Sequence, residues 1–424
     1  MADVTEPRRI LMATIGSLGD LHPILALAVE LKARGHFVTV ASTEYYRGRV
    51  ERLGIGFSPL RPNWDPTDQA LIAQCEDLKS GPEVLFRQMI LPQLRDTYQD
   101  LLAAAADAEL MIAGELVFAA PLVAEKLGLR WVSEILSPTS FFSAHDPSLL
   151  VNIPAVYRLR RAGWVVNRAI LNFGKLVSRH WWRPVRNLRR EQGLRVECDP
   201  IFRDKFSPDL VLALFSASLA RPQPDWPRQT LQPGFVFFDG NPGDEPPEMD
   251  IFLKAGEAPI VFTLGSTAVS HPGNFYQASA AAARQLGRRA LLIGARPEEF
   301  AGSTDILATR YASYARVFPH AAAVVHQGGS GTTGQAMRAG RPQLVVPYGW
   351  DQPDNGARVG RRGAGLCLAR SGYTAANASG ALRRLLGERE FAAKATELGA
   401  QVRNDNALQP ACDAIEQLLA TIPQ

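Results

Sequence analysis

Residues 324–359 read VVHQGGSGTTGQAMRAGRPQLVVPYGWDQPDNGARV. A short apolar run ends at His326 and leads into the flexible turn GGSGTTG. A helical segment at 335–339, an apolar strand at 343–347 and a polar loop at 348–355 follow. This order is typical of a parallel α/β sheet. At such a turn, backbone N–H groups and the positive end of a helix gather, and both attract anions. The stretch therefore predicts a phosphate-binding turn.

The composition limits the kind of protein. With 424 residues, 46% hydrophobic and 21% charged, the chain is expected to form two globular domains. A net charge of +4 gives little support for a nucleic-acid partner. The sequence shows no apolar run long enough to span a bilayer and no secretory signal before its first glycine, so we expect a cytoplasmic protein. Four scattered cysteines without a CxxC pair predict reduced thiols rather than zinc ligands: Cys75, Cys198, Cys367 and Cys412.

The first half opens with a strand, a turn, a helix and a second strand. RILMATI (9–15) is a dense apolar run, apolar residues recur at helical spacing over 22–33, and FVTVAS (37–42) follows as a strand. Asp20 lies where the first strand meets the helix, at the sheet edge where ligands collect in such folds. An aspartate in this place can equally be a helix cap, and His22 can be an ordinary first-turn residue.

The segment 151–193 has an unusual charge and aromatic content. Between residues 147 and 190 there are ten Lys or Arg and no acidic residue. Three interpretations remain: a solvated basic face whose tryptophans pack inward, an apolar lid over an acceptor pocket, or contact with an anionic membrane. The interleaved aromatic residues are Trp164, Phe173, Trp181 and Trp182.

The second half restarts the alternation of strands and helices. Residues 220–258 are rich in Pro and Gly, which predicts an interdomain linker between a first domain at 1–219 and a second at 259–405. An amphipathic helix within 406–424 is expected to pack back on the first domain. The fold class is therefore predicted to be α/β, with two facing doubly wound, Rossmann-like domains.

Several alternative motifs are missing. The turn at 327–334 lacks the Gly-Lys-Ser/Thr of a P-loop, and GSLGD at 16–20 does not match the dinucleotide fingerprint G-x-G-x-x-G. No Asp-x-Asp pair is present to hold a metal ion beside a diphosphate. An NAD(P)-dependent oxidoreductase is therefore disfavoured, and we expect no metal and no cofactor beyond the substrate itself.

A resemblance narrows this prediction. The segment FPHAAAVVHQGGSGTTGQAMRAGRPQLVVPYGWDQPDNGARV resembles the nucleotide-sugar signature of the family 1 glycosyltransferases, which have the two-domain GT-B fold. The opening ATIGSLGDLHPILALAVELKARGHFVTVAS resembles the acceptor-side start of bacterial members, close to the branch of the sterol glycosyltransferases and the rhamnolipid rhamnosyltransferase. SEILSPTSFFSAHDP, QPDWP, PGFVFFDG and VFTLGST are also similar to that branch, so the likeness covers nearly the whole sequence.

The resemblance implies roles for donor-side residues. His326 matches the histidine that contacts the donor phosphate, and Asp351 and Gln352 match the pair that hydrogen-bonds the donor sugar. Residues 311–317 occupy the place of the loop that holds the base, although no stacking residue can be named. Further donor-binding residues in two glycine turns are implied: Ser266, Thr267, Gly328, Gly329, Gly331, Thr332 and Thr333.

The resemblance also implies a base. Plant members carry a catalytic histidine in the first turn; that position resembles Asp20 in this chain, with His22 as the second candidate. Aromatic residues at Phe141, Phe142 and Trp164 are expected to contact a lipophilic acceptor.

The expected activity is metal-independent, inverting transfer of rhamnose or glucose from a dTDP- or UDP-sugar. The expected acceptor is a hydroxyl of a lipophilic small molecule, such as a hydroxy-fatty acid, a sterol or a flavonoid-like compound. Peripheral contact with the inner face of the membrane is expected through 151–193. The alternatives are a nucleotide-sugar epimerase of the same fold and a non-catalytic membrane-docking module.

Overall fold

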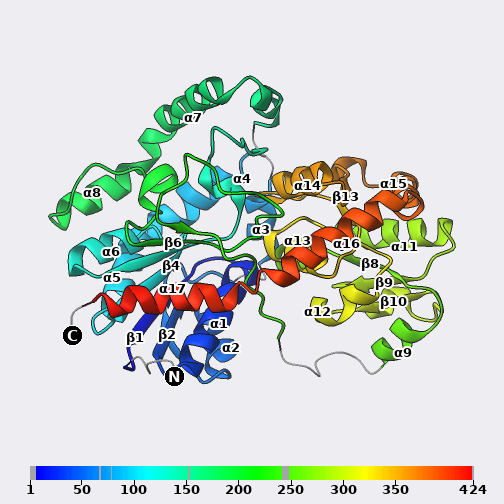
Figure 1. Cartoon of the computed structure of the whole chain (residues 1–424), viewed down its shortest axis with the longest axis horizontal. Coiled ribbons are helices and arrows are strands. Elements are labelled where there is room, and N and C mark those ends of the chain that lie inside the picture. The colour runs from blue at the N-terminus through cyan, green and yellow to red at the C-terminus, as the bar shows by residue number, and fades with distance from the viewer. Residues whose placement is uncertain (1–5, 66–67, 78, 151–152, 241–247, 423–424) are drawn as a thin grey trace.

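The computed structural model describes residues 6–65, 68–77, 79–150, 153–240 and 248–422. Two parallel sheets lie side by side, each flanked by helices, with the first half of the chain at the left of Figure 1 and the second half at the right. Among the described residues, no helix combines the length and the apolar character needed to cross a membrane.

The first sheet has seven parallel strands with β1 in the interior. The run RILMA forms β1 because both faces of this strand are covered, and four of its five residues are buried. In pairing order the strands are β3 (Gly56–Pro59), β2 (Phe37–Ser42), β1 (Arg9–Ala13), β4 (Leu110–Gly114), β5 (Trp131–Ile135), β6 (Leu210–Ala213) and β7 (Thr230–Leu231). The α-helices of this half are α1 (Leu18–Ala33), α2 (Arg47–Glu51), α3 (Gln69–Cys75), α4 (Gly81–Glu83), α5 (Leu94–Ala104), α6 (Ala120–Leu127), α7 (Trp164–Ser178) and α8 (Arg183–Glu191).

The second sheet has six parallel strands and repeats the doubly wound plan. In pairing order they are β10 (Ile306–Thr309), β9 (Ala290–Ile293), β8 (Ile260–Thr263), β11 (Ala323–His326), β12 (Gln343–Val345) and β13 (Gly365–Cys367). The α-helices of this half are α9 (Glu248–Lys254), α10 (Gly265–Ala268), α11 (Phe275–Gln285), α12 (Tyr314–Val317), α13 (Ser330–Arg338), α14 (Gln352–Arg361), α15 (Ala375–Gly387), α16 (Arg389–Asn404) and α17 (Leu408–Ala420).

The Pro- and Gly-rich segment 220–258 is more than a linker. Residues Thr230–Leu231 pair with β6 as the last strand of the first sheet, and Phe235 packs against the backbone of Gly334. A Cβ on Gly334 would lie 2.8 Å from the Phe235 ring, so α13 needs glycine at this approach. Residues 241–247 of the segment lie outside the described residues.

Two element boundaries differ from the sequence prediction. The helix expected at 335–339 begins earlier, because α13 starts inside the glycine turn at Ser330. The polar loop expected at 348–355 ends sooner, because α14 starts at Gln352 and contains Asn355. Proline is well accommodated in a first helical turn, where its missing N–H has no partner to lose, so the WDQPDN pattern begins a helix rather than a turn.

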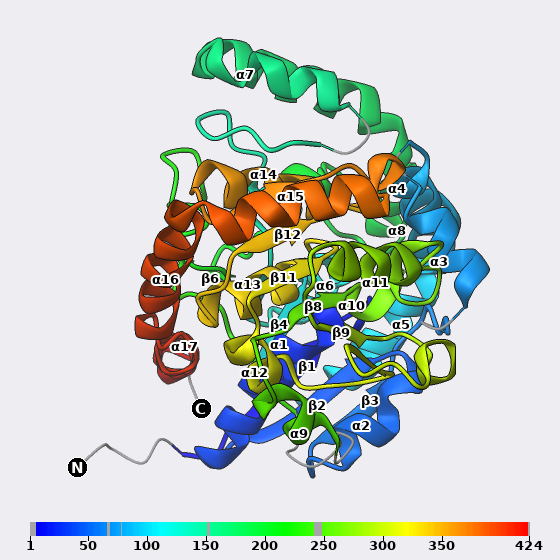
Figure 2. The same cartoon turned by 90° about the vertical axis from the view of Figure 1, so that its right-hand side faces the viewer.

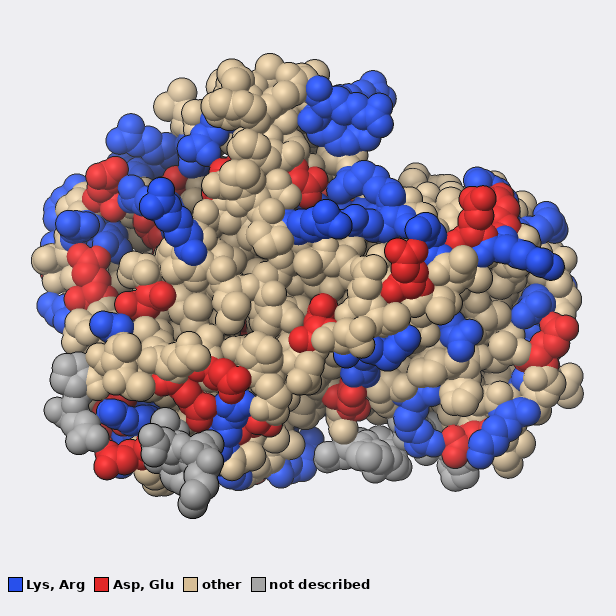
Figure 3. Space-filling model, viewed as in Figure 1, with Lys and Arg blue, Asp and Glu red and all other residues tan. Residues whose placement is uncertain are grey.

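The basic segment forms a projecting helix. Figure 2 shows α7 standing apart from both sheets at the top of the molecule. Figure 3 shows that its crest is largely uncharged, whereas charged side chains of both signs cover much of the surface below. The prediction of inward-packed tryptophans fits Trp182, which is buried, and Trp181, which packs against the same core. Trp164 and Phe173 are exposed instead. Residues 151–152 lie outside the described residues.

The last helix crosses back to the first half. Figure 1 shows α17 crossing in front of the first sheet, and it packs against α1. Ile415 and Leu419 are buried in the same core as the inner face of α1. At the rim, Arg34 forms ion pairs with Asp413 and Glu416, both at 2.6 Å.

Truncating one side chain in this contact tests how much the packing of α17 contributes to the stability of the first domain. We expect Ile415→Ala to destabilise the first domain by about 2–5 kcal/mol, because it removes a fully buried aliphatic group and leaves a cavity. Urea unfolding followed by circular dichroism measures the change. The matched control is Gln417→Ala on the exposed face of α17, which should leave the midpoint unchanged. Equal midpoints for both variants would contradict the packing of α17.

Candidate active site

The first strand ends in a turn that holds Asp20. Ser17 is the N-cap of α1: its hydroxyl accepts the Gly19 N–H at 3.1 Å, while Asp20 Oδ2 accepts the Ser17 N–H at 2.7 Å. This reciprocal pair is a capping box. Gly16 has φ 143°, and a Cβ there would lie 2.3 Å from Asp20 Oδ2. Asp20 therefore stabilises the helix start, as the cap interpretation required, and its carboxylate is held at the edge of the sheet.

Burial alters the acidity of both candidate bases. It raises the pKa of Asp20 to about 6; hydrogen bonds from Ser17 oppose this, and the Glu115 charge adds to it. Burial lowers the pKa of His22 to about 4, with a smaller effect from Arg49. The buried His22 Nε2 has no hydrogen-bond partner among the described residues. At pH 7 the site thus holds an ionised aspartate of raised pKa beside a neutral imidazole.

Two further carboxyl groups belong to this edge, and the sequence prediction missed both. Glu115 follows β4; its carboxylate accepts the Ser140 hydroxyl at 2.7 Å and pairs with Lys205 at 2.8 Å. Glu134 lies in β5, is 1% exposed, and its Oε1 has no partner among the described residues. Burial raises the pKa of Glu134 well above its usual value, and the charges of Asp20 and Glu115 raise it further.

A sequence signal for these residues existed. An acid directly after a buried parallel strand points to a ligand edge, and an acid inside an apolar strand is rarely buried without a reason. No three His, Cys, Asp or Glu side chains in the described part of the chain gather so as to hold a metal ion.

His326 is placed differently from the expectation of a phosphate contact. It is fully buried at the end of β11; its Nε2 lies 2.9 Å from Gln343 Oε1, and its Nδ1 accepts the Gly328 N–H at 3.0 Å. Burial lowers its pKa to about 4, against a smaller opposing effect of the Gln343 hydrogen bond, so the ring is neutral. Both nitrogens are engaged inside the protein. In this structure His326 therefore shapes the turn, and its contact with a donor phosphate stays a prediction.

Gln327, the next residue, is also buried but lies on the other side of the chain from His326. Side chains alternate across a strand, so the residue next to the buried His326 points to the other side. A Cβ on Gly265 would lie 2.1 Å from Gln327 Nε2, and one on Gly329 would lie 2.9 Å from it, so the amide sits between the two glycine turns. Its Oε1 is buried without a partner among the described residues.

The two glycine turns flank the Gln327 amide. Gly328 has φ 96°, and a Cβ there would lie 2.6 Å from Val345 Cγ1, so the tight turn requires glycine. Gly329 is the N-cap of α13, and no side chain caps this helix, so its N-terminal N–H groups are available to an anion. The remaining predicted turn residues comprise exposed Ser266 and Gly331, half-buried Thr267, and buried Thr332 and Thr333.

The start of α14 carries the predicted sugar-binding pair. Asp351 Oδ2 accepts the Asn355 amide at 2.7 Å, and the same amide donates to the Gly328 carbonyl at 2.9 Å. Gln352 Oε1 accepts the Tyr348 and Gly349 N–H groups, which leaves its NH2 group for a ligand. These bonds fix both side chains against the glycine turn.

The charges of the two halves act on one another. Burial raises the pKa of Asp351 to about 7; the Asn355 hydrogen bond opposes this, and the charges of Glu115 and Asp20 add to it. Asp20 and Asp351 come from opposite halves of the chain, and the two halves touch at this place, where the Ser330 hydroxyl at the start of α13 donates to the Leu136 carbonyl after β5. The structure thus brings the predicted base and the predicted sugar-binding residue into one site.

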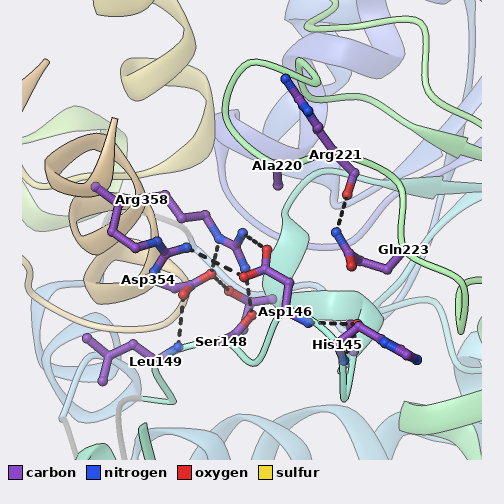
Figure 4. Close-up of polar contacts among 12 residues, drawn as sticks. His145, Asp146, Ser148, Leu149, Ala220, Arg221, Gln223, Asp354 and Arg358 are labelled. Atoms are coloured by element: carbon purple, nitrogen blue, oxygen red, sulfur yellow. Dashed lines mark hydrogen bonds and ion pairs between the residues drawn. The ribbon is translucent and has the colours of Figure 1, made fainter. Parts of the chain in front are cut away.

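A buried ion network closes the two halves over this site. Arg358 is almost fully buried; its guanidinium pairs with Asp354 of its own helix at 2.7 Å and with Asp146 of the first half (Figure 4). Asp354 also accepts the Leu149 N–H at 2.8 Å and the Thr139 hydroxyl at 3.1 Å. The loop after β5 is therefore bound to the helix that presents Asp351.

The aromatic residues predicted to contact an acceptor are not gathered in one place. Phe141 is buried and stacks on Trp226 with ring centroids 3.9 Å apart, so it belongs to the core rather than to an acceptor surface. Phe142 packs on Phe202 with ring centroids 4.6 Å apart. Trp164 stacks on His145 at the surface, on α7. Sequence alone could not separate core aromatics from surface ones, because all three lie in irregular or amphipathic segments.

Known proteins resemble this chain along its length. The family model described as "Glycosyltransferase family 28 N-terminal domain" matches residues 10–138, and the model described as "Erythromycin biosynthesis protein CIII-like, C-terminal domain" matches residues 306–422. The chain is 33% identical to the O-mycaminosyltylonolide 6-deoxyallosyltransferase of Streptomyces fradiae, over 97% of this chain and 98% of that protein. It is 27% identical to the sterol 3-beta-glucosyltransferase of Aspergillus oryzae over 97% of this chain, which spans only 30% of that relative.

Solved structures share the architecture. The spinosyn forosaminyltransferase SpnP matches 97% of this chain and 99% of its own with a TM-score of 0.71 and 20% identity. The glycosyltransferase VinC, solved in complex with dTDP, matches 97% of this chain and 99% of its own with a TM-score of 0.69 and 21% identity. The predicted pair of facing Rossmann-like domains is confirmed by these likenesses.

The neutral, buried His326 makes a testable contribution to stability. Its folded pKa of about 4 lies below the ordinary value of 6.5, so the folded state favours the neutral ring. This contribution is complete above pH 6.5 and is lost as pH falls towards 4, by at most about 1.4 kcal/mol per pH unit. We expect His326→Asn, which can still accept the Gly328 N–H, to lose stability less steeply between pH 6.5 and 4. Urea unfolding of both proteins at pH 7 and pH 5 measures this, and identical pH dependence would contradict it.

Proposed function

This chain belongs to the glycosyltransferases of the GT-B fold, and we propose that it transfers a sugar from a nucleoside diphosphate to a hydroxyl group of a lipophilic small molecule. Because members of this family are enzymes, the alternative of a membrane-docking module without catalytic activity is excluded. The observation that carries the proposal is the contact of the uncapped start of α13 with the first half, where the Ser330 hydroxyl donates to the Leu136 carbonyl after β5. The charge of Asp20 also contributes to the raised pKa of Asp351 across the two halves.

The proposed reaction is a single displacement with inversion. The acceptor oxygen bonds to the anomeric carbon while the bond from that carbon to the diphosphate oxygen breaks. Asp20 accepts the proton of the acceptor hydroxyl; its pKa of about 6, rather than an ordinary carboxylate value, suits a general base near neutral pH. His22 remains the second candidate, because it is neutral and its Nε2 is unpaired among the described residues.

The leaving diphosphate takes the electron pair and needs stabilisation. In the proposal the N–H groups at the start of α13 and the amide of Gln327 supply it, an oxyanion-hole-type contribution that requires no metal. His326 contributes indirectly: its Nδ1 accepts the Gly328 N–H and so stabilises the shape of the turn. Asp351 and the free NH2 group of Gln352 hold the sugar hydroxyls at the start of α14.

The donor is proposed to be dTDP-rhamnose, with UDP-glucose second. Support comes from the relatives: one is named for transfer of a 6-deoxyallosyl group, another for transfer of glucose to a sterol, and VinC was solved with dTDP. The same names support a lipophilic acceptor, among which we propose a sterol, a hydroxy-fatty acid or a flavonoid-like compound. We place the reaction in the cytoplasm, at the inner face of the membrane when the acceptor is a lipid.

Replacing the proposed base tests the mechanism. We expect Asp20→Asn to lower turnover by about a hundredfold or more while dTDP affinity stays the same, because only proton transfer is lost. At pH values below about 6, the kcat/KM of the wild type should decrease, because Asp20 becomes protonated. The residual activity of the variant should not show this decrease.

The control is Asp107→Asn, a change at an exposed carboxylate of the same domain. Unimpaired turnover in Asp20→Asn would remove Asp20 from the role, and a matching loss in His22→Gln alone would transfer it to His22. Consumption of the donor with no acceptor present, giving an isomeric nucleotide sugar, would favour the epimerase.

A charge placed beside the diphosphate tests the donor half. We expect Gln327→Glu to weaken dTDP binding at least tenfold, since a carboxylate between the glycine turns would repel the diphosphate. Calorimetric titration with dTDP, UDP and GDP measures this, and the wild type should bind dTDP most tightly. Gln401→Glu makes the same charge change on the exposed face of α16 and should bind as the wild type does. Equal affinity for both variants would exclude Gln327 from the site.

A further inference from the structure

The outer face of α7 and of the preceding 3-10 helix, Pro154–Arg161, forms an apolar ridge. We call this surface the α7 ridge. More than half of the exposed large apolar side chains in the described parts of the chain belong to residues 153–177. Those with the greatest exposure on α7 are Trp164, Val165, Phe173, Leu176 and Val177, between 54% and 68%. Large apolar groups in contact with water are normal singly, but their concentration on one element marks an interaction surface.

The exposed groups lie on one side of the helix. Val165, Ala169, Phe173 and Leu176 follow one another at helical spacing and are all exposed, so they form one stripe. The opposite side is anchored: Asn167 is buried and donates to the Ala144 carbonyl at 3.1 Å. The stripe is thus turned away from the protein, and the interpretation of α7 as a lid over an acceptor pocket does not fit this placement.

Basic side chains border the stripe. Arg168, Lys175 and Arg179 lie along one flank of α7 by helical spacing. The Lys175 ammonium turns towards the protein, 5.3 Å from the centre of the Phe202 ring, so the two arginines supply the outward charge of this flank. Arg158 and Arg161 add charge before the helix. None of these five has an acidic side chain within ion-pair distance among the described residues, although elsewhere most arginines are paired. Figure 3 shows basic side chains at both ends of the uncharged crest and no acidic one on it.

The apolar stripe and the basic flank together indicate which partner the α7 ridge binds. A protein partner would be expected to meet the ridge with a matching pattern of both signs, whereas ten basic residues and no acid over residues 147–190 suit a surface of uniform negative charge. A helix with an apolar stripe, a basic flank and aromatic residues is the form that lies in the interface of anionic lipid bilayers.

We propose that the α7 ridge docks this protein on an anionic phospholipid bilayer. The apolar stripe enters the boundary between headgroups and acyl chains, and the flanking arginines lie among the phosphates. Docking goes beyond the proposed glycosyl transfer, because it depends on neither the donor nor the acceptor. It also orients the molecule: the buried face of α7 holds the loop at 144–146, which ends at the Asp146 partner of Arg358.

Vesicle binding tests the proposal without any substrate. The full chain is sedimented with vesicles of phosphatidylcholine alone or with about 30% phosphatidylglycerol, at low and at high salt. We expect at least about tenfold stronger binding to the anionic vesicles, weakened by salt, with a blue shift of tryptophan fluorescence as Trp164 leaves water.

Two sets of variants separate the contributions. Phe173→Glu combined with Leu176→Glu should reduce binding to anionic vesicles at least about tenfold, because it places charge in the stripe. Arg168→Gln with Lys175→Gln and Arg179→Gln should remove the salt-sensitive part. The control is Ile251→Glu, a change at an exposed apolar side chain on α9 that should bind as the wild type does. Unchanged dTDP affinity verifies that each variant is folded.

Three results would overturn the proposal. The first is equal binding to neutral and anionic vesicles, and the second is unchanged binding by the Phe173 and Leu176 double variant. The third is absence of vesicle binding together with a concentration-dependent dimer that the double variant abolishes, which would assign the ridge to a second copy of the chain.

Discussion

The buried guanidinium of Arg358 sets the relation between the two halves of the molecule. A charge out of contact with water must be paired, and breaking such a pair typically costs about 3–5 kcal/mol. Arg358 finds Asp354 on its own helix but needs Asp146 from the other half, and the loop at 146–149 is drawn against α14 as a result. The same helix starts at Asp351 and Gln352. The ion network therefore fixes the position of the Asp351 end of α14 relative to the first half, and its contribution lies in geometry more than in net stability.

Crowded carboxyl groups give the site its electrostatic character. Asp20, Glu115, Glu134 and Asp351 influence one another, and the pKa of each of Asp20, Glu134 and Asp351 is raised. Groups coupled in this way titrate as a set, so a proton taken up by one is felt by the others. The raised pKa of Glu134 favours its protonated form, which can donate a hydrogen bond where an ionised carboxylate could only accept one. Three of these acids lie at the edge of the first sheet, and the fourth, Asp351, approaches from the second half at the start of α14.

The architecture could be predicted from the sequence because dense apolar runs such as RILMA are buried on both faces of a parallel strand, and glycine turns mark their ends. The site was only partly predictable. Which of two neighbours, His326 or Gln327, lies between the two glycine turns depends on Gln343 of the next strand, which binds the histidine. Phe141 looked like a surface aromatic because its partner Trp226 is distant in the sequence. Contacts of this kind arise from tertiary packing, which local patterns do not encode.

The return of α17 to the first half makes the two domains unequal as modules. Chain order suggests that the enzyme could be divided at the segment after β7, with an acceptor half before it and a donor half after it. In space, α1 is covered by α17, a helix that follows the second sheet in the chain. Its residues Ile415 and Leu419 are buried in the hydrophobic core of the first domain. A chimera that joins the first half to a foreign second half would bring a foreign helix against α1. Recombination that respects the fold therefore has two crossover points, so that residues 408–420 travel with the first domain.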